Sequence, residues 1–165
     1  LARVESSKLH LSRTHQTIPG LVAEAVKQTT SLNGKPVQTL YPEKLPEIDV
    51  DAELFVLALK QLVDNAAKYS PHGTPIRVTA EASADSIWIR VHNQGPGLSE
   101  SERTLVFERF YRSPATRGHV AGTGIGLAIA RDIVQAHGGF VDVESGPGMG
   151  TEFSVRLPLG KGEPA

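Results

Sequence analysis

Glycines at the start of a predicted helix point to an anion-binding site in this sequence. The segment G-T-G-I-G-L carries three alternating glycines, and a helical pattern of apolar residues follows directly. Glycine lets the backbone approach a ligand closely, and the free N–H groups and dipole at a helix start attract anions. A phosphate chain is the obvious anion. Taken alone, the segment is equally consistent with an ordinary loop before a helix.

A row of polar side chains follows one side of an earlier predicted helix. Gln61, Asn65 and Lys68 are spaced four and three residues apart, so they share one side of that helix. Asp51 is suited to cap its start, and Pro71-His72-Gly73 ends it. The apolar positions of the same helix are Leu54, Phe55, Ala58, Leu62, Val63, Ala66 and Ala67. By itself, such a polar row is more often a solvated helix face than a site.

Several other chemistries are excluded by the motifs that the sequence lacks. It has no G-x-x-x-x-G-K-[ST] segment, and no strand leads into its alternating glycines, so neither the P-loop nor the dinucleotide fingerprint fits. No His, Asp and Glu residues cluster at metal-ligand spacing, and no serine-nucleophile motif is present.

Composition describes an ordinary globular chain. The 165 residues are 39% hydrophobic and 21% charged, enough for one core and one domain. With a net charge of −1 and no basic stripe, nucleic acid is not an expected partner. The absence of cysteine fits a reducing compartment, and neither a signal peptide nor an apolar run of membrane-spanning length occurs. We therefore expect a cytoplasmic domain, cut from a larger protein because the chain begins without Met.

The order of predicted elements indicates an α+β fold. Residues 1–17 are interpreted as the end of an upstream dimerisation and phosphoacceptor region or a linker, 18–160 as the domain, and 161–165 as a tail. The predicted elements are a helix through 18–26, strands at 37–41 and 47–50, the helix after Asp51, strands at 76–80 and 87–91, a short helix capped by Ser99 and Glu102, the glycine-initiated helix ended by 137–139, and a hairpin of 140–144 with 152–157. This order predicts a two-layer sandwich, in which about three helices cover one face of a mixed, mostly antiparallel sheet.

Five short motifs in this order resemble a known family. They are N-A-A-K-Y, Q-G-P-G, F-E-R-F-Y-R, G-T-G-I-G-L-A-I and a closing G-M-G-T. Together they are similar to the ATP-binding catalytic domain of bacterial sensor histidine kinases, in the GHKL or Bergerat-fold ATPase superfamily. N-A-A-K-Y-S-P with a short lid also resembles the potassium-sensing subclass. The resemblance covers about residues 18–158 and implies Mg²⁺ and ATP as cofactors.

The resemblance assigns roles to individual residues. Asn65 would bind the Mg²⁺ that bridges the phosphates, as a neutral oxygen ligand suits a cation already balanced by phosphate. Asn93 would face the adenine amino group, Lys68 would pair with phosphate, and Arg117 would reach the phosphates from a lid over 113–121. The remaining residues implied in ATP binding are Tyr69, Gly95, Gly97, Phe107, Phe110, Arg112, Gly122, Thr123, Gly124, Ile125, Gly126, Leu127 and Thr151.

Two positions depart from the family pattern. Asn93 stands where Asp is common, which keeps an acceptor but gives up a charge-assisted bond worth about 1 kcal/mol, or roughly fivefold in affinity. Gln61 stands where the ATP-hydrolysing relatives have a Glu general base, and an amide cannot abstract a proton. No residue of the chain is therefore assigned as a general base, which favours phosphotransfer over hydrolysis.

None of the six histidines matches the phosphoacceptor that the resemblance implies. The acceptor is typically followed by an acidic residue, whereas these are followed by Leu, Gln, Gly, Asn, Val and Gly. We interpret all six as solvent-exposed or turn histidines and expect the acceptor upstream of this fragment. The implied partners are the protein's own dimerisation and phosphoacceptor domain and a response-regulator receiver domain, in a homodimer compatible with membrane anchoring.

Two other functions remain as alternatives. The first is a nucleotide-binding regulatory or scaffold domain with degraded activity, suggested by Asn93 and Gln61. The second is a clamp-type ATPase of the same superfamily, which Gln61 disfavours.

Overall fold

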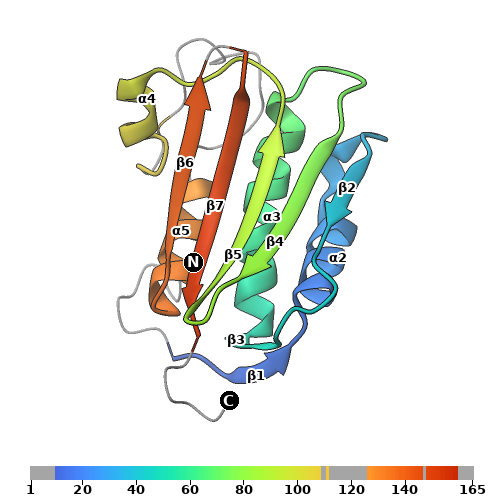
Figure 1. Ribbon diagram of the computed structural model, residues 1–165. Coiled ribbons are helices and arrows are strands. Elements are labelled where there is room, and N and C mark those ends of the chain that lie inside the picture. Colours follow the sequence, from blue (N-terminus) through green and yellow to red (C-terminus); the bar gives the residue numbers. More distant parts are fainter. Residues whose placement is uncertain (1–9, 109–110, 112–125, 147, 160–165) are drawn as a thin grey trace.

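A five-stranded sheet forms one layer of the protein. The computed structural model describes residues 10–108, 111, 126–146 and 148–159. Strands follow the order β2-β4-β5-β7-β6, where β2 and β4 are parallel and the other neighbours are antiparallel (Figure 1). Their bounds are β2 Val37–Leu40, β4 Ile76–Ala82, β5 Ser86–Asn93, β6 Phe140–Gly146 and β7 Gly150–Pro158. The predicted mixed, mostly antiparallel sheet is confirmed.

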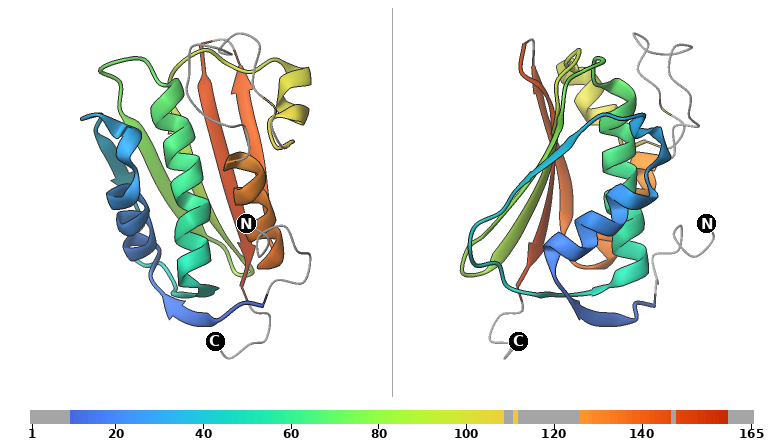
Figure 2. Two further views of the ribbon diagram at one scale, coloured as in Figure 1. Left: turned by 180° about the vertical axis from the view of Figure 1, so that it is seen from behind. Right: turned by 90° about the vertical axis from the view of Figure 1, so that its right-hand side faces the viewer.

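Helices form the second layer, on one face of the sheet. The left view of Figure 2 shows α2, α3 and α5 side by side in front of the strands, while the other face of the sheet carries no helix of the described chain. Their bounds are α2 Ile18–Gln28, α3 Ala52–Tyr69 and α5 Gly126–Ala136; a short 3-10 helix, η1, spans Thr30–Leu32, and α4 spans Glu100–Leu105 near β6. The two-layer α+β architecture predicted from the sequence is therefore correct.

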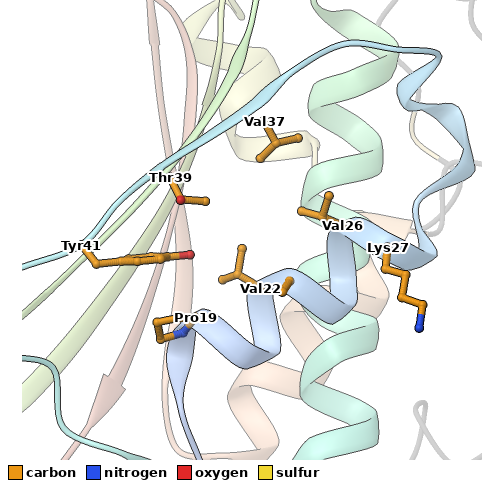
Figure 3. A pocket seen from close by; sticks show the side chains of 8 residues that line it. Pro19, Val22, Val26, Lys27, Val37, Thr39 and Tyr41 are labelled. Carbon is orange, nitrogen blue, oxygen red and sulfur yellow. The ribbon is translucent and has the colours of Figure 1, made fainter.

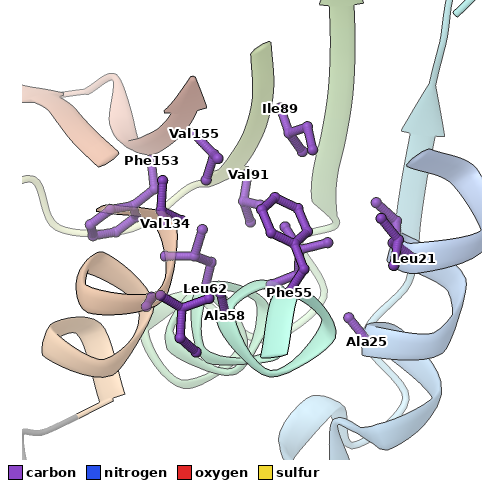
Figure 4. Close-up of a cluster of buried hydrophobic side chains, with 14 of the residues drawn as sticks. Leu21, Ala25, Phe55, Ala58, Leu62, Ile89, Val91, Val134, Phe153 and Val155 are labelled. Carbon is purple, nitrogen blue, oxygen red and sulfur yellow. The ribbon is translucent and has the colours of Figure 1, made fainter. Parts of the chain in front are cut away.

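The core lies between these layers and follows the predicted periodicities. All seven apolar positions expected on the helix after Asp51 are buried, as are the inward residues of β4 and β5. Phe55 and Leu62 of α3 meet Val91 and Phe153 of the sheet (Figure 4). Each buried side chain of this size contributes about 1.5–3 kcal/mol relative to exposure. This packing fixes α3 against the centre of the sheet, and with it the polar row that α3 carries.

The starts of α3 and α4 are set by the predicted caps, and the start of α2 is set by a cap that was not predicted. The Asp51 carboxylate accepts the Leu54 N–H at 3.1 Å, and the Thr17 hydroxyl accepts from Gly20 at 3.2 Å. Ser99 and Glu102 form the expected capping box at the start of α4. Each cap satisfies a backbone donor that would otherwise lack a partner.

A second, two-stranded sheet was not predicted in full. Arg13–Gln16 form β1, which pairs antiparallel with β3, Ile48–Asp51, below the main sheet (Figure 1). The R-T-H-Q segment has no apolar alternation, and three of its four residues are exposed, so its sequence carries no strand pattern. Ser12 donates its backbone N–H to the Asp51 carboxylate at 3.0 Å, which ties this segment to the start of α3.

Candidate functional site

The polar row of α3 faces the start of α5. Gln61, Asn65 and Lys68 are all half-buried, on the side of α3 away from its apolar contacts. A Cβ placed on Gly126 would lie 2.6 Å from Gln61 Oε1, so the Gln61 amide rests directly against this glycine. The helix that begins at Gly126 therefore starts beside the row, one helical turn from Asn65. The described end of the G-T-G-I-G-L segment, at Gly126, therefore lies next to the polar row.

Asn65 has an amide that the rest of the described chain does not use. It forms no hydrogen bond to another described residue, although it is only half-exposed to solvent. No group of three or more His, Asp or Glu side chains that could hold a metal occurs among the described residues. A divalent cation beside Asn65 would therefore need most of its oxygen ligands from phosphate and water, which suits Mg²⁺. The donor set fits a cation carried in by a nucleotide.

Lys68 is already paired within α3. Its ammonium lies 3.1 Å from a carboxylate oxygen of Asp64, and both side chains are less than one-third exposed. The Ser31 hydroxyl donates a very short hydrogen bond to the other oxygen of Asp64. This chain of contacts holds the Lys68 amine at the edge of the polar row. The predicted pairing of Lys68 with phosphate stays a prediction and would require the amine to share or exchange its partner.

Asn93 closes β5 at the same end of the sheet. Its side chain is 3% exposed, and its Nδ2 donates to the Gln94 carbonyl at 2.7 Å. This bond fixes the amide orientation, and Oδ1 is the acceptor that forms no hydrogen bond to another described residue. Asn93 pairs in register with Thr151 of β7, so the two residues predicted for the adenine site are direct cross-strand neighbours.

Ser145 ties the loop after Asn93 to the neighbouring strands, a role that sequence reasoning missed. Its hydroxyl accepts the Leu98 N–H at 2.7 Å, donates to the Gly150 carbonyl at 2.8 Å, and lies 3.0 Å from the Thr151 hydroxyl. Serine at a strand end is too common to signal such a function. The sequence therefore indicated the loop but not what holds it in place.

Gly95 and Gly97 allow close packing within the protein itself. Gly95 has φ of +139°, and a Cβ there would lie 2.6 Å from the Tyr69 carbonyl oxygen. A Cβ on Gly97 would lie 2.7 Å from the Gly146 carbonyl oxygen. These contacts pack the loop between the end of α3 and the end of β6. The predicted approach of both glycines to an adenine ring stays a prediction, and so does a position for Tyr69 near the sugar.

Lys35 supports the same end of α3 and was also not anticipated. Its ammonium donates to the Ala67 and Ser70 carbonyls, at 2.5 and 3.1 Å. A cation at a helix C-terminus is favourable because the last carbonyls lack partners and the dipole is negative there.

The other predicted residues divide into packed positions and positions outside the described chain. Phe107 is buried with its ring edge-on to Phe153, at a centroid distance of 5.8 Å, and Leu127 packs partly against the core. The predictions that lie outside the described residues are Phe110, Arg112, Arg117, Gly122, Thr123, Gly124, Ile125 and the lid over 113–121.

His137 is a turn histidine, in line with its interpretation, but it is buried. It lies in the turn after α5, as expected, but is 4% exposed. Its Nδ1 donates to the Ile133 carbonyl at 2.8 Å, and its Nε2 accepts the Asp51 N–H at 3.0 Å, so the ring is neutral. Burial is the main cause that lowers the pKa of His137, assisted by Arg13 and opposed by the Ile133 hydrogen bond and Asp51. His137 therefore joins α5 to the start of α3 at the end of the fold opposite Asn93.

Comparison with known proteins identifies the family. Residues 50–161 match the family described as histidine kinase-, DNA gyrase B-, and HSP90-like ATPase, and the chain belongs to this family. It is similar to the sensor protein IrlS of Burkholderia pseudomallei, with 40% identity over 68% of this chain and 24% of that protein. It is also similar to the sensor protein KdpD of Escherichia coli, with 32% identity over 96% of this chain and 18% of that protein. The chain thus spans a quarter or less of these relatives.

A solved structure supports the same class. The full-length ShkA structure in complex with AMPPNP matches with a TM-score of 0.81 and 27% identity, covering 95% of this chain and 33% of that one. The chain is therefore an ATP-binding catalytic domain of the sensor histidine kinase type. The resemblance inferred from the five motifs is confirmed, while the potassium-sensing subclass stays a prediction. No helix among the described residues is long and apolar enough to cross a membrane.

Proposed function

We propose that this domain binds Mg²⁺–ATP between the end of α3, the Asn93–Gly97 loop and the start of α5, and presents the γ-phosphate to a histidine. One observation carries the proposal: Gly126 lies against Gln61 and Gly95 lies against Tyr69, so the start of α5 and the loop after Asn93 both contact the stretch of α3 that contains Asn65. The AMPPNP in the similar ShkA structure supports an ATP-like ligand.

Each part of the site would supply a different contact. Asn93 Oδ1 would accept from the adenine amino group, and Thr151 beside it would support that contact. Asn65 would ligate Mg²⁺, which would neutralise charge on the phosphates when bound. The backbone at Gly126 and Leu127 would donate to phosphate oxygens, since the first N–H groups of a helix lack partners. Lys68 would add a cation at the rim.

The chemistry of these residues favours transfer over hydrolysis. Phosphoryl transfer needs mainly positioning and charge neutralisation, which amides, backbone N–H groups and a cation can supply. Gln61, which rests on Gly126, cannot act as a general base toward water. His137 is disfavoured as the phosphate acceptor, because it is buried and both of its ring nitrogens are hydrogen-bonded. The acceptor histidine would lie outside this chain, as would the response-regulator partner and any membrane anchor.

Calorimetric titration with ATP, with and without Mg²⁺, tests the binding site. We expect wild-type protein to bind Mg²⁺–ATP, and Asn65→Ala or Asn65→Asp to lose the Mg²⁺-dependent part of the affinity while remaining folded. Gln28→Ala is the matched control, because that exposed amide on α2 bonds only to Glu24, at 2.8 Å, among the described residues. Unchanged Mg²⁺–ATP affinity in both Asn65 variants would remove Asn65 from the site.

Steady-state hydrolysis separates transfer from a clamp-type ATPase. Without a general base at Gln61, the isolated domain should bind ATP but turn it over very slowly. Appreciable ATPase activity of the wild-type domain, abolished by Asn65→Ala, would contradict the phosphotransfer proposal and favour the clamp-type function. Binding without phosphotransfer to a supplied dimerisation domain would favour a regulatory nucleotide-binding domain.

A further inference from the structure

An apolar groove runs between α2 and β2, on the side of the fold away from the α3–α5 contact. Its volume is about 430 Å³. Val22 and Val26 of α2 face Val37 and Thr39 of β2, and the Tyr41 hydroxyl points into the space between them (Figure 3). The remaining lining residues are Pro19, Ala23 and Lys27. The groove opens beside β2, the strand at one edge of the sheet.

The strand that borders this groove has an open backbone edge. Within the described part of the chain, β2 is the terminal strand of the sheet and pairs only with β4. Pro36 accepts the Ile76 N–H at 2.9 Å, so the even-numbered residues of this segment turn their backbone groups toward β4. Because alternate residues of a strand direct their N–H and C=O groups to opposite sides, those of Val37 and Thr39 point away from the sheet. Their side chains line the groove, so open backbone and apolar wall are adjacent.

The opposite edge of the same sheet is protected, which makes the contrast informative. β6 carries Asp142 and Glu144, and the Asp142 carboxylate accepts the Val143 N–H at 2.9 Å. Charged side chains and internally satisfied backbone groups are devices by which proteins block the addition of a further strand. The V-Q-T-L sequence of β2 has no charge and no proline, and its Leu40 is 69% exposed. The shortness of β2 and the prolines that flank it, Pro36 and Pro42, limit the length of an added strand.

We propose that the edge of β2 and the α2–β2 groove bind an extended segment of a partner protein, which adds to the sheet as a further strand. Backbone groups of the segment would pair with Val37 and Thr39, and its alternate side chains would enter the groove. Those side chains should be apolar and of valine or leucine size. An acidic residue should lie at the Lys27 end, because Lys27 is an exposed cation on the groove rim and no acidic residue lines the groove.

The small size of the surface favours a peptide segment over a second copy of the chain. β2 has four residues, and a stable interface between two folded domains buries about 1,200–2,000 Å². A short strand and one groove cannot supply this area to a rigid partner. An extended segment instead gains main-chain hydrogen bonds along the edge and side-chain contacts in the groove.

A synthetic peptide tests the proposal without knowledge of the partner. The probe is a capped peptide in which valine alternates with threonine, with glutamate at both ends. Amide NMR should show shifts along β2, together with new protection from hydrogen exchange at Val37 and Thr39. The Gln38 amide, which already faces β4, should gain little protection. Peptides with proline at alternate positions, or with lysine at the ends, should bind more weakly.

Variants at one position separate strand addition from general stickiness. Thr39→Pro removes an outward N–H that the sheet does not need and should weaken peptide binding about fivefold, as expected for a lost hydrogen bond. Thr39→Val keeps the N–H and should bind like the wild type. Ala23→Glu, which adds a charge at an exposed position of the groove, should also weaken binding while leaving the fold intact.

Three results would overturn the proposal. The first is the absence of β2 shifts at millimolar peptide, and the second is equal binding by wild type and Thr39→Pro. The third is a dimer of the chain alone, seen by sedimentation, that Thr39→Pro dissociates, because the occupant would then be a second copy. None of these results depends on nucleotide binding, so the proposed function is tested separately.

Discussion

Replacing Gly97 by alanine should weaken ATP binding through a clash inside the protein. Gly97 is not among the glycines with positive φ, so alanine meets no backbone strain there. Its Cβ, however, would lie 2.7 Å from the Gly146 oxygen, 2.9 Å from the Gly146 carbonyl carbon and 3.1 Å from the Ser145 hydroxyl. Restoring an ordinary 3.4 Å contact to that oxygen requires a separation of 0.7 Å, the difference between 3.4 and 2.7 Å.

The surrounding contacts decide which part moves. Gly146 pairs with Gly150 on β7, and Ser145 holds both Leu98 and the Gly150 carbonyl. The Asn93–Gly97 loop should therefore shift instead of the strands. Overpacking of this kind costs about 1–3 kcal/mol of stability. If the shift also removes one hydrogen bond of about 1 kcal/mol to adenine, ATP affinity should fall roughly fivefold.

A glycine at the other end of the fold provides the control. Gly138 has φ of +84°, and the nearest atom to an added Cβ is Pro158 Cγ at 3.8 Å. Gly138→Ala should cost about 1–2 kcal/mol of stability through backbone strain alone and leave ATP affinity unchanged. Denaturant unfolding and calorimetric ATP titration measure both quantities for the two variants. If Gly97→Ala binds ATP as tightly as wild type while losing stability, the loop is not part of the nucleotide site.

Further predictions concern the ionisable residues. Because burial lowers the pKa of His137, its stabilising contribution should be complete above the unfolded-state pKa of 6.5 and decline as pH falls below that value. His137→Gln should flatten the dependence of the free energy of unfolding on pH, measured by denaturant unfolding. An unchanged dependence would show that another group dominates it. Asp64→Asn should free the Lys68 amine, change ATP affinity by up to about threefold and make that affinity more dependent on salt. If neither the affinity nor its salt dependence changes, Lys68 lies outside the site. Lys35→Met should destabilise the protein by about 1 kcal/mol, measured by thermal unfolding, and full stability would show that water replaces its two hydrogen bonds.

Periodic patterns predicted most of the fold, because burial on one face imposes them directly. The apolar face of α3, the alternation in β4 and β5, and the caps at Asp51 and Ser99 all appear where the sequence indicated. The β1 strand was missed because its residues are exposed and its partner, β3, lies more than thirty positions along the chain. Backbone pairing of polar residues leaves no periodic trace in sequence.

The roles predicted for the site residues stay predictions, and the internal supports of this part of the fold were not predicted. Short motifs indicated Asn65, Asn93 and the glycines, since their spacing reflects chemistry shared across a family. The roles of Ser145 and Lys35 depend on distant segments that the fold brings together, so local sequence does not reveal them. The burial of His137 within its turn was not predicted for the same reason, because its partner Asp51 lies 86 residues away.

Paramagnetic NMR with Mn²⁺ and AMPPNP would test most directly whether the metal and phosphates lie between α3 and α5. Mn²⁺ takes the place of Mg²⁺ and broadens the signals of nearby amides. We expect the strongest broadening at Asn65 and Gly126, a weaker effect at Gly95, and none at Val37 or Thr39 on the far edge of the sheet. Broadening centred away from Asn65, or absent from Gly126, would contradict the proposed site.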